Sequence, residues 1–224
     1  MHHSYKKPAL LFFVISFAFS LFAQNGNHST FYYQRVSLFE KLPTSNEDII
    51  FLGNSITNGG EWVELLNDER IKNRGISGDV CNGVIDRLNS IVDGKPAKVF
   101  LMIGINDLAR GTSPDSIVSQ TGQIINKIMS CSPNTLIYVQ SILPVNEAFN
   151  MFSGHTQHKK IIKDINNKLE RLAKLKGVKF IDLYSHFVTP GTCNLDTAYT
   201  NDGLHLMGDG YLKWTEIVKP YIYE

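Results

Sequence analysis

The chain has 224 residues, of which 43% are hydrophobic and 19% are charged, a balance that suits one compact domain with a substantial core. Its formal net charge is +1, and it contains no long basic or acidic block. This composition argues against a basic nucleic-acid surface and against a polybasic membrane contact, so we expect no nucleic acid among its partners. It says nothing about the oligomeric state.

The first 23 residues have the pattern of a secretory signal peptide. Lys6 and Lys7 precede an apolar run from Ala9 to Phe22, and the small residue Ala23 follows the run. The run is shorter than the roughly 20 residues needed to cross a bilayer, which favours a cleaved signal over a membrane anchor. We predict cleavage after Ala23, one domain over residues 24–224, and a secreted or periplasmic protein with no stable membrane anchor after cleavage.

Alternating strand and helix patterns follow in the rest of the chain. Apolar runs bounded by glycine, proline or polar residues predict strands at 48–52, 98–103, 135–142 and 178–183, and the segment 71–76, between two helical patterns, is predicted as a further strand. Apolar residues at helical spacing predict helices at 31–42, 62–66, 80–92, 114–130, 155–176 and 208–221. Such alternation predicts an α/β fold with a five-stranded parallel sheet, and right-handed crossovers then give a three-layer αβα sandwich.

A serine follows the first predicted strand directly. The run from Ile49 to Leu52 ends at Gly53, and Ser55 comes two residues later. Ligands of open parallel sheets bind beyond the carboxyl ends of the strands, so Ser55 lies where a nucleophile would be placed. The alternative is an ordinary polar turn in which Asn54 or Ser55 caps the next helix.

The other groups that a serine hydrolase needs come from the same predicted sheet edge. His205 is the candidate base for Ser55, and Asp202, three residues earlier, could hold the second ring nitrogen of His205. The backbone N–H groups of Ser55 and Gly75 and the side-chain amide of Asn106 are candidate donors to an oxyanion. Each segment alone could be a turn or a solvated histidine. Their joint arrangement favours catalysis.

Four segments resemble, in order, the sequence blocks of the SGNH hydrolases, also called GDSL esterases. Gly53-Asn54-Ser55-Ile56-Thr57 resembles the nucleophile block, and Asn73-Arg74-Gly75-Ile76-Ser77-Gly78-Asp79 resembles the second block. Gly104-Ile105-Asn106-Asp107 matches the third block, and Asp202-Gly203-Leu204-His205 matches the last. The four blocks span almost the whole predicted mature chain.

The resemblance implies a flavodoxin-like fold in which Ser55, Gly75, Asn106 and His205 are the name-giving positions and Asp202 completes the triad. It implies no cofactor and no metal. The residues of the second block resemble those of the platelet-activating-factor acetylhydrolase-like branch, which prefers short acyl groups, especially acetyl. The chain departs from the family at position 54, where the usual Gly-Asp-Ser is Gly-Asn-Ser.

Two further features allow alternatives. His155 and His158 have metal-ligand spacing on a predicted helix, but no third ligand is evident, and we interpret them as surface or pocket-rim residues. The loop 147–152 contains aromatic residues that could form the rim of an acyl or sugar site or pack over the core. The cysteines Cys81, Cys131 and Cys193 could form one disulfide with one free thiol, or be three buried thiols.

We predict an exported serine esterase that removes a short acyl group, acetyl in particular, through an acyl-enzyme. Its substrate would be a small-molecule or glycan ester, with O-acetylated carbohydrate favoured by the combination of export and family resemblance. Three alternatives remain open: a lysophospholipase or thioesterase on the same triad, an O-acetyltransferase, and a non-catalytic carbohydrate-binding protein.

Overall fold

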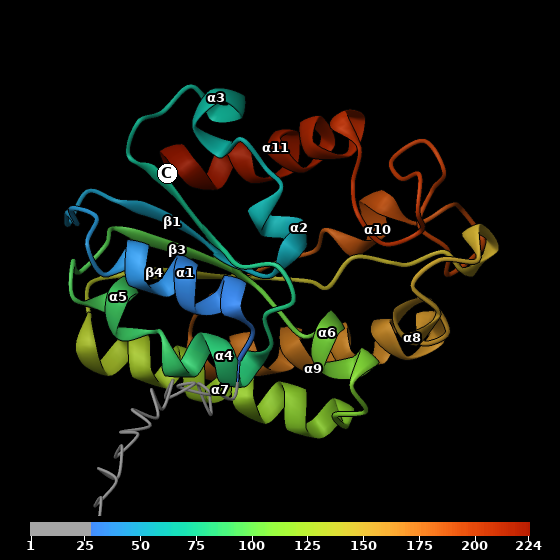
Figure 1. The fold of residues 1–224 in the computed structure, drawn as a ribbon, viewed down its shortest axis with the longest axis horizontal. Helices are drawn as coiled ribbons and strands as arrows, with labels where there is room; N and C mark the ends of the chain where they lie inside the picture. The colour runs from blue at the N-terminus through green and yellow to red at the C-terminus, as the bar shows by residue number, and fades with distance from the viewer. Residues whose placement is uncertain (1–27) are drawn as a thin grey trace, which may run out of the picture.

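Five parallel strands form the central sheet, in the order β2-β1-β3-β4-β5 (Figure 1). The computed structural model describes residues 28–224, so the predicted signal peptide lies outside the described residues. The strands are β1 (Ile49–Gly53), β2 (Ile71–Gly75), β3 (Lys98–Met102), β4 (Leu136–Gln140) and β5 (Lys179–Ile181). The sequence-based fold class is confirmed, and the strand order is that of flavodoxin-like sheets.

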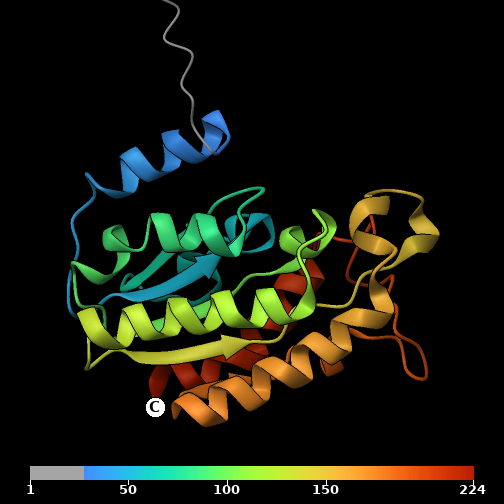
Figure 2. The ribbon, with the colours of Figure 1, turned by 90° about the horizontal axis from the view of Figure 1, so that it is seen from below.

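Helices cover both faces of the sheet, which gives the three predicted layers. On one face lie α2 (Ser55–Asn58), α3 (Trp62–Leu66) and α11 (Gly208–Tyr223), drawn above the strands in Figure 1. On the other face lie α4 (Cys81–Asp86), α5 (Asn89–Val92), α7 (Pro114–Cys131) and α9 (Lys159–Lys176), with α7 and α9 side by side (Figure 2). The short elements α6 (Ile105–Ala109), η1 (Glu147–Phe149), α8 (Ser153–Thr156) and α10 (Tyr184–Phe187) follow strands β3, β4 and β5.

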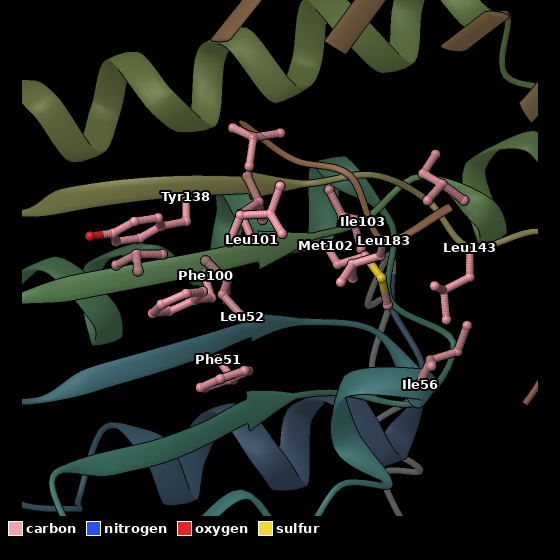
Figure 3. Packing of buried hydrophobic residues seen from close by; sticks show 14 of the residues in the cluster. Phe51, Leu52, Ile56, Phe100, Leu101, Met102, Ile103, Tyr138, Leu143 and Leu183 are labelled. Carbon is pink, nitrogen blue, oxygen red and sulfur yellow. The ribbon is translucent and has the colours of Figure 1, made fainter. Parts of the chain in front are cut away.

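A row of aromatic rings crosses the centre of the sheet. Phe51 on β1, Phe100 on β3 and Tyr138 on β4 are paired in register, with ring centroids 5.0 and 4.5 Å apart (Figure 3). Trp62 of α3 stacks on Phe51 at 4.3 Å, and Trp214 of α11 meets Trp62 edge to face. Burying each such ring stabilises the fold by about 1.5–3 kcal/mol, so the row fixes these strands and helices against one another.

The start of α7 and the end of α9 are marked by capping residues in the sequence. The Ser113 side chain accepts the N–H of Ser116, and Pro114 occupies the first turn of α7, where a missing N–H costs nothing. Gly177 ends α9 in the left-handed conformation, at φ 68°. The start of α7 and the end of α9 therefore agree with the predicted boundaries.

Three predicted helices differ from the structure. The predicted helix 80–92 is divided into α4 and α5 at Arg87, whose side chain turns into the protein and is 0% exposed. The predicted helix 155–176 is divided into α8 and α9, so His155 and His158 do not share one helix. The predicted lead-in helix 31–42 is α1 (Thr30–Phe39), and its buried residues Tyr32 and Phe39 pack on Ile76 in a small cluster apart from the main core.

Candidate active site

Ser55 lies beyond the carboxyl end of β1, at the first residue of α2. Strand β1 is fully buried, and it ends at Gly53, which pairs with Gly75 of β2. Asn54 then caps α2, because its side-chain oxygen accepts the N–H of Ile56 at 3.1 Å. The cap fixes the first turn of α2 and leaves the Ser55 side chain half-buried at the sheet edge.

The structure brings Ser55, His205 and Asp202 into one hydrogen-bonded chain. Ser55 Oγ is 3.1 Å from His205 Nε2, and His205 Nδ1 is 2.7 Å from Asp202 Oδ2. A carboxylate only accepts hydrogen bonds, so the ring proton belongs on Nδ1, and Nε2 is left to accept the Ser55 hydroxyl proton. This arrangement can deprotonate a serine as it attacks a carbonyl carbon.

The second oxygen of Asp202 organises the turn that carries His205. Asp202 Oδ1 accepts the backbone N–H groups of Leu204 at 2.8 Å and of His205 at 2.7 Å. Burial alone would raise the pKa of Asp202, but these two N–H groups and the His205 imidazole together lower that pKa below its usual value. The carboxylate is therefore charged at neutral pH and can stabilise an imidazolium on His205.

Asn106 is placed by α6, the short helix after β3. Its side chain is 7% exposed, and its Nδ2 donates a hydrogen bond to the backbone carbonyl of Asp79 at 2.8 Å. Asn106 lines the cleft that contains Ser55 and His205, as predicted from its position at the strand end. The second hydrogen on Nδ2 is free to serve a bound oxygen.

Gly75, the predicted oxyanion glycine, is not placed for that task. Gly75 is the last residue of β2, and its N–H donates to the Asn73 side chain at 2.9 Å. A Cβ atom at position 75 would lie 2.2 Å from the backbone N of Asn58, so glycine is needed here for packing against α2. This prediction is corrected, because the N–H has a partner and the residue is buried away from the cleft.

Gly78, three residues further on, lines the cleft instead. It is exposed, has φ +78°, and lies in the loop 76–80 that links β2 to α4. Arg110 donates from Nη2 to the Gly78 carbonyl at 2.7 Å, which holds this peptide at the cleft wall. Gly78 was not predicted, because Gly75 and Gly78 lie in the same sequence block and their roles differ only through the position at which β2 ends. The rule that could have identified Gly78 is that ligands of parallel sheets bind beyond the carboxyl ends of the strands, so that a residue after β2 is a better candidate than one within it.

The loop 147–152 supplies one wall of the cleft. The Phe152 ring lies edge to face against His205, with centroids 5.0 Å apart, and Phe152 is 41% exposed. This favours the rim hypothesis over core packing for Phe152. His155 of α8 also lines the cleft, and its Nε2 is 2.9 Å from Asn106 Oδ1.

The cleft has a volume of about 550 Å³, and Ser55, Asn106 and His205 line it. Gly75 and Asp202, the other predicted site residues, do not line it. Larger or similar hollows lie over α1, at about 790 Å³, and beside α9, at about 520 Å³. Neither of those contains Ser55, Asn106 or His205. The cleft at the sheet edge is therefore the one that the candidate nucleophile can serve.

Other groups have structural surroundings of their own. Cys81 is buried, Cys131 is exposed and Cys193 is intermediate, and the three are unpaired, so neither sequence-based alternative for the cysteines holds in full. Across residues 28–224, no three side chains of His, Cys, Asp and Glu converge as metal ligands would. Within the same residues, every helix is too short or too polar to span a membrane.

Residues 51–213 match the GDSL-like lipase/acylhydrolase family, and the chain belongs to that family. The resemblance to the SGNH hydrolases inferred from the four blocks is thereby confirmed. Membership of this family supports an ester-hydrolysing activity, and it implies small-molecule esters as the class of substrate.

Two solved structures resemble the chain in fold, at 27% and 19% sequence identity. The chain is 27% identical to a solved Streptococcus pneumoniae protein provisionally named a platelet activating factor, with a TM-score of 0.78, covering 86% of this chain and 93% of that one. An acetyl-xylooligosaccharide esterase from Geobacillus stearothermophilus has the same fold, with a TM-score of 0.64 at 19% identity, covering 80% and 95% of the two chains.

A sequence relative is much longer than this chain. The chain is 29% identical over 175 residues to an Escherichia coli N-acylneuraminate cytidylyltransferase, and the match covers 75% of this chain. It spans only 38% of that protein's length. The name of the longer protein therefore describes a chain of which this one resembles a part.

Proposed function

We propose that the protein is an exported serine esterase that removes acetyl groups from O-acetylated carbohydrate. The observation that carries the proposal is the hydrogen-bonded chain from Ser55 Oγ through His205 to Asp202. A nucleophile, a base and a group that orients the base are the parts that acyl transfer requires.

In the first step, Ser55 Oγ attacks the acyl carbonyl carbon while His205 Nε2 takes the hydroxyl proton. The carbonyl oxygen gains negative charge, which the N–H groups of Ser55 and Gly78 and the Asn106 amide stabilise. The tetrahedral species collapses, the C–O bond to the alcohol breaks, and His205 gives its proton to the leaving oxygen. Asp202 stabilises the imidazolium throughout this step.

In the second step, water releases the acyl group from Ser55. His205 Nε2 takes a proton from the water as its oxygen attacks the acyl-enzyme carbonyl. The same donors stabilise the second oxyanion, and the proton returns to Ser55 Oγ as the carboxylic acid leaves. Phe152 packs edge to face against one side of the His205 imidazole, whose other contacts leave Nε2 open to the cleft.

Three observations support a small acyl group and a carbohydrate alcohol. The chain resembles the short-acyl branch of the family in the segment 74–79. The same fold carries the activity of an acetyl-xylooligosaccharide esterase in Geobacillus stearothermophilus. Residues 1–23 have the pattern of a signal peptide, which would place the enzyme outside the cytoplasm, where polysaccharides are found.

The test uses the chain from Gln24 onward with p-nitrophenyl esters of increasing acyl length and with acetylated xylooligosaccharides. We expect the highest kcat/KM with acetate, acetate release from the sugar, and loss of several orders of magnitude in Ser55→Ala and His205→Ala. Ser185→Ala and His186→Ala are matched controls, because both side chains are exposed on α10 and away from the cleft. Rapid turnover of long-chain lipid esters with acetylated sugars untouched would refute the substrate assignment.

A further inference from the structure

His155 contacts the oxyanion-hole amide, although the hydrolytic mechanism gives it no proton to move. Its Nε2 lies 2.9 Å from Asn106 Oδ1, within hydrogen-bonding distance. An amide oxygen only accepts, so His155 Nε2 must carry the proton and donate it. The side chain therefore has a defined tautomer and a defined partner in the cleft.

The contact bears on which way the Asn106 amide faces. Asn106 Nδ2 donates to the Asp79 carbonyl at 2.8 Å, and Asn106 Oδ1 accepts from His155. If the amide were turned by 180°, its oxygen would face the Asp79 carbonyl, which is repulsive, and His155 would have to change tautomer to accept from the NH2 group. The two partners together hold the second Nδ2 hydrogen in one direction, as a preorganised donor requires.

The charge state of His155 fits this role. Burial lowers the pKa of His155, and the neighbouring His205 and Arg110 lower it further. The neutral ring can donate from Nε2 without adding a cation next to the imidazolium that forms on His205. Accepting a hydrogen bond at its oxygen also polarises the Asn106 amide and strengthens its N–H groups as donors.

The segment that carries His155 is held in an unusual backbone conformation. Asn150 and Phe152 have φ values of +55° and +49°, a region that residues with side chains rarely adopt. The Phe152 carbonyl accepts the N–H groups of His155 at 2.7 Å and of Thr156 at 3.0 Å, which starts α8 at this point. Backbone strain of this kind persists where the surrounding contacts require it, and it commonly marks functional sites.

We propose that His155 is a positioning residue of the oxyanion hole, which holds the Asn106 amide so that its free N–H faces the developing oxyanion. This inference rests on the proposed function, because an oxyanion forms only if Ser55 attacks an acyl carbonyl. His155 acts through Asn106 and takes no part in proton transfer.

Three substitutions at His155 separate the hydrogen bond from the shape of the ring. His155→Ala and His155→Phe have no donor, and we expect kcat to fall about tenfold with KM unchanged, the loss of roughly one hydrogen bond in the transition state. His155→Gln can place an amide N–H near the former Nε2 position, and we expect it to recover most of the rate. His158→Ala is the matched control, because His158 lies three residues away and does not contact Asn106.

A double-mutant cycle tests whether His155 acts through Asn106. Asn106→Ala alone should cost about 10²–10³ in kcat, the usual loss for one oxyanion donor. In that background, His155→Ala should change kcat less than twofold, since its partner is gone. An undiminished tenfold loss there would overturn the inference, and so would a fully active His155→Phe variant in an enzyme that Ser55→Ala inactivates.

A second measurement does not depend on activity. NMR of the wild type should show His155 protonated at Nε2, and His155→Phe should shift the side-chain NH2 resonances of Asn106. If the wild type shows no Ser55-dependent ester hydrolysis, the proposed function fails, and these resonances still decide whether His155 holds Asn106. Resonances of Asn106 that are identical in the wild type and in His155→Phe would overturn the inference by themselves.

Discussion

Gly75 and Gly78 stand three residues apart, yet only Gly78 lies in the cleft. Gly75 is buried at the end of β2, where a Cβ atom would meet the backbone of Asn58 at 2.2 Å. Gly78 is exposed at φ +78°, and a Cβ atom there would have Arg110 Nη2 as its nearest neighbour, 3.8 Å away. The first glycine is thus required by close packing and the second by backbone conformation.

Alanine at each position should separate these two requirements. Gly75→Ala should lower the free energy of unfolding by about 1–3 kcal/mol, because α2 must move away from β2. Gly78→Ala should cost about 1–2 kcal/mol of stability if the loop keeps its left-handed conformation. If the peptide rotates to relieve the strain, its N–H turns away from the oxyanion and kcat should fall about tenfold or more.

Urea unfolding and steady-state hydrolysis of a p-nitrophenyl ester measure the two effects. If Gly78 belongs to the oxyanion hole, Gly78→Ala should lower kcat more than Gly75→Ala does, relative to the stability that each variant loses. A Gly78→Ala variant with normal kcat and a Gly75→Ala variant that is stable but inactive would instead favour Gly75 as the oxyanion donor.

The structure around Asn54 explains why asparagine can replace the family's usual aspartate at this position. Its side chain is 1% exposed, and its oxygen accepts the N–H of Ile56, a contact that an amide oxygen can make as well as a carboxylate. A neutral side chain at this position also avoids the cost of burying a charge beside Ser55. The residue therefore shapes the turn of the nucleophile and has no role in proton transfer.

At the scale of elements, the loop 76–80 is tied to β1 by a buried ion pair. Arg87 donates from Nε to Asp79 Oδ2 at 2.9 Å and from Nη2 to the Gly53 carbonyl at 3.2 Å. The two side chains are 0% and 1% exposed. Burial raises the pKa of Asp79 and lowers the pKa of Arg87, so desolvation outweighs the attraction of the partner at both groups. The pair connects the loop of Gly78 to the strand of Ser55.

Arg87→Met should therefore be strongly destabilising, because it leaves the Asp79 carboxylate buried without its cation. We expect the free energy of unfolding to fall by about 3–5 kcal/mol, measured by urea denaturation at pH 7. Lys213→Met is the control, since its ion pair with Glu216 is exposed on α11 and should contribute less than about 1 kcal/mol. A loss at Arg87 no larger than at Lys213 would contradict the structural role of the pair.

Elements with strong local signals could be predicted from the sequence. Strands β1, β3 and β4 are apolar runs that end in glycine or polar residues, and the alternation of strands with helices determines the layers. The division of the helix 80–92 could not be predicted, because a charged residue such as Arg87 is usually solvent-exposed, and its buried partner Asp79 becomes apparent only in three dimensions. Periodicity does not show where a charged side chain points.

The same limit applies to the site. Ser55, Asn106, Asp202 and His205 each follow a strand or sit in a polar turn, so the sheet edge brings them together as predicted. His155 is interpreted from the sequence as a surface or pocket-rim residue, but its contact with Asn106 depends on the fold of the loop after β4. Long loops place side chains through tertiary contacts that a sequence pattern does not contain.

At the scale of the whole molecule, α1 lies outside the family match at residues 51–213 and packs against α4 and the loop 76–80. The Tyr32 hydroxyl donates to the Gly83 carbonyl of α4 at 2.8 Å, and Phe39 is 1% exposed. The guanidinium groups of Arg35, Arg74 and Arg87 face the Phe39 ring, at 4.7, 4.9 and 5.9 Å from its centroid. The helix therefore covers both the buried ion pair and Ile76, the first residue of the loop that carries Gly78.

Removing the Phe39 ring should accordingly affect both stability and catalysis. Phe39→Ala leaves a cavity among Tyr32, Ile76 and the arginines, and the free energy of unfolding should fall by about 3–5 kcal/mol. Because the loop 76–80 then loses its cover, kcat should also fall about tenfold, measured at a temperature where the variant is folded. Leu38→Ala, at a 44% exposed position of the same helix, should change neither quantity appreciably. A folded Phe39→Ala variant with wild-type kcat would mean that α1 stabilises the fold without shaping the cleft.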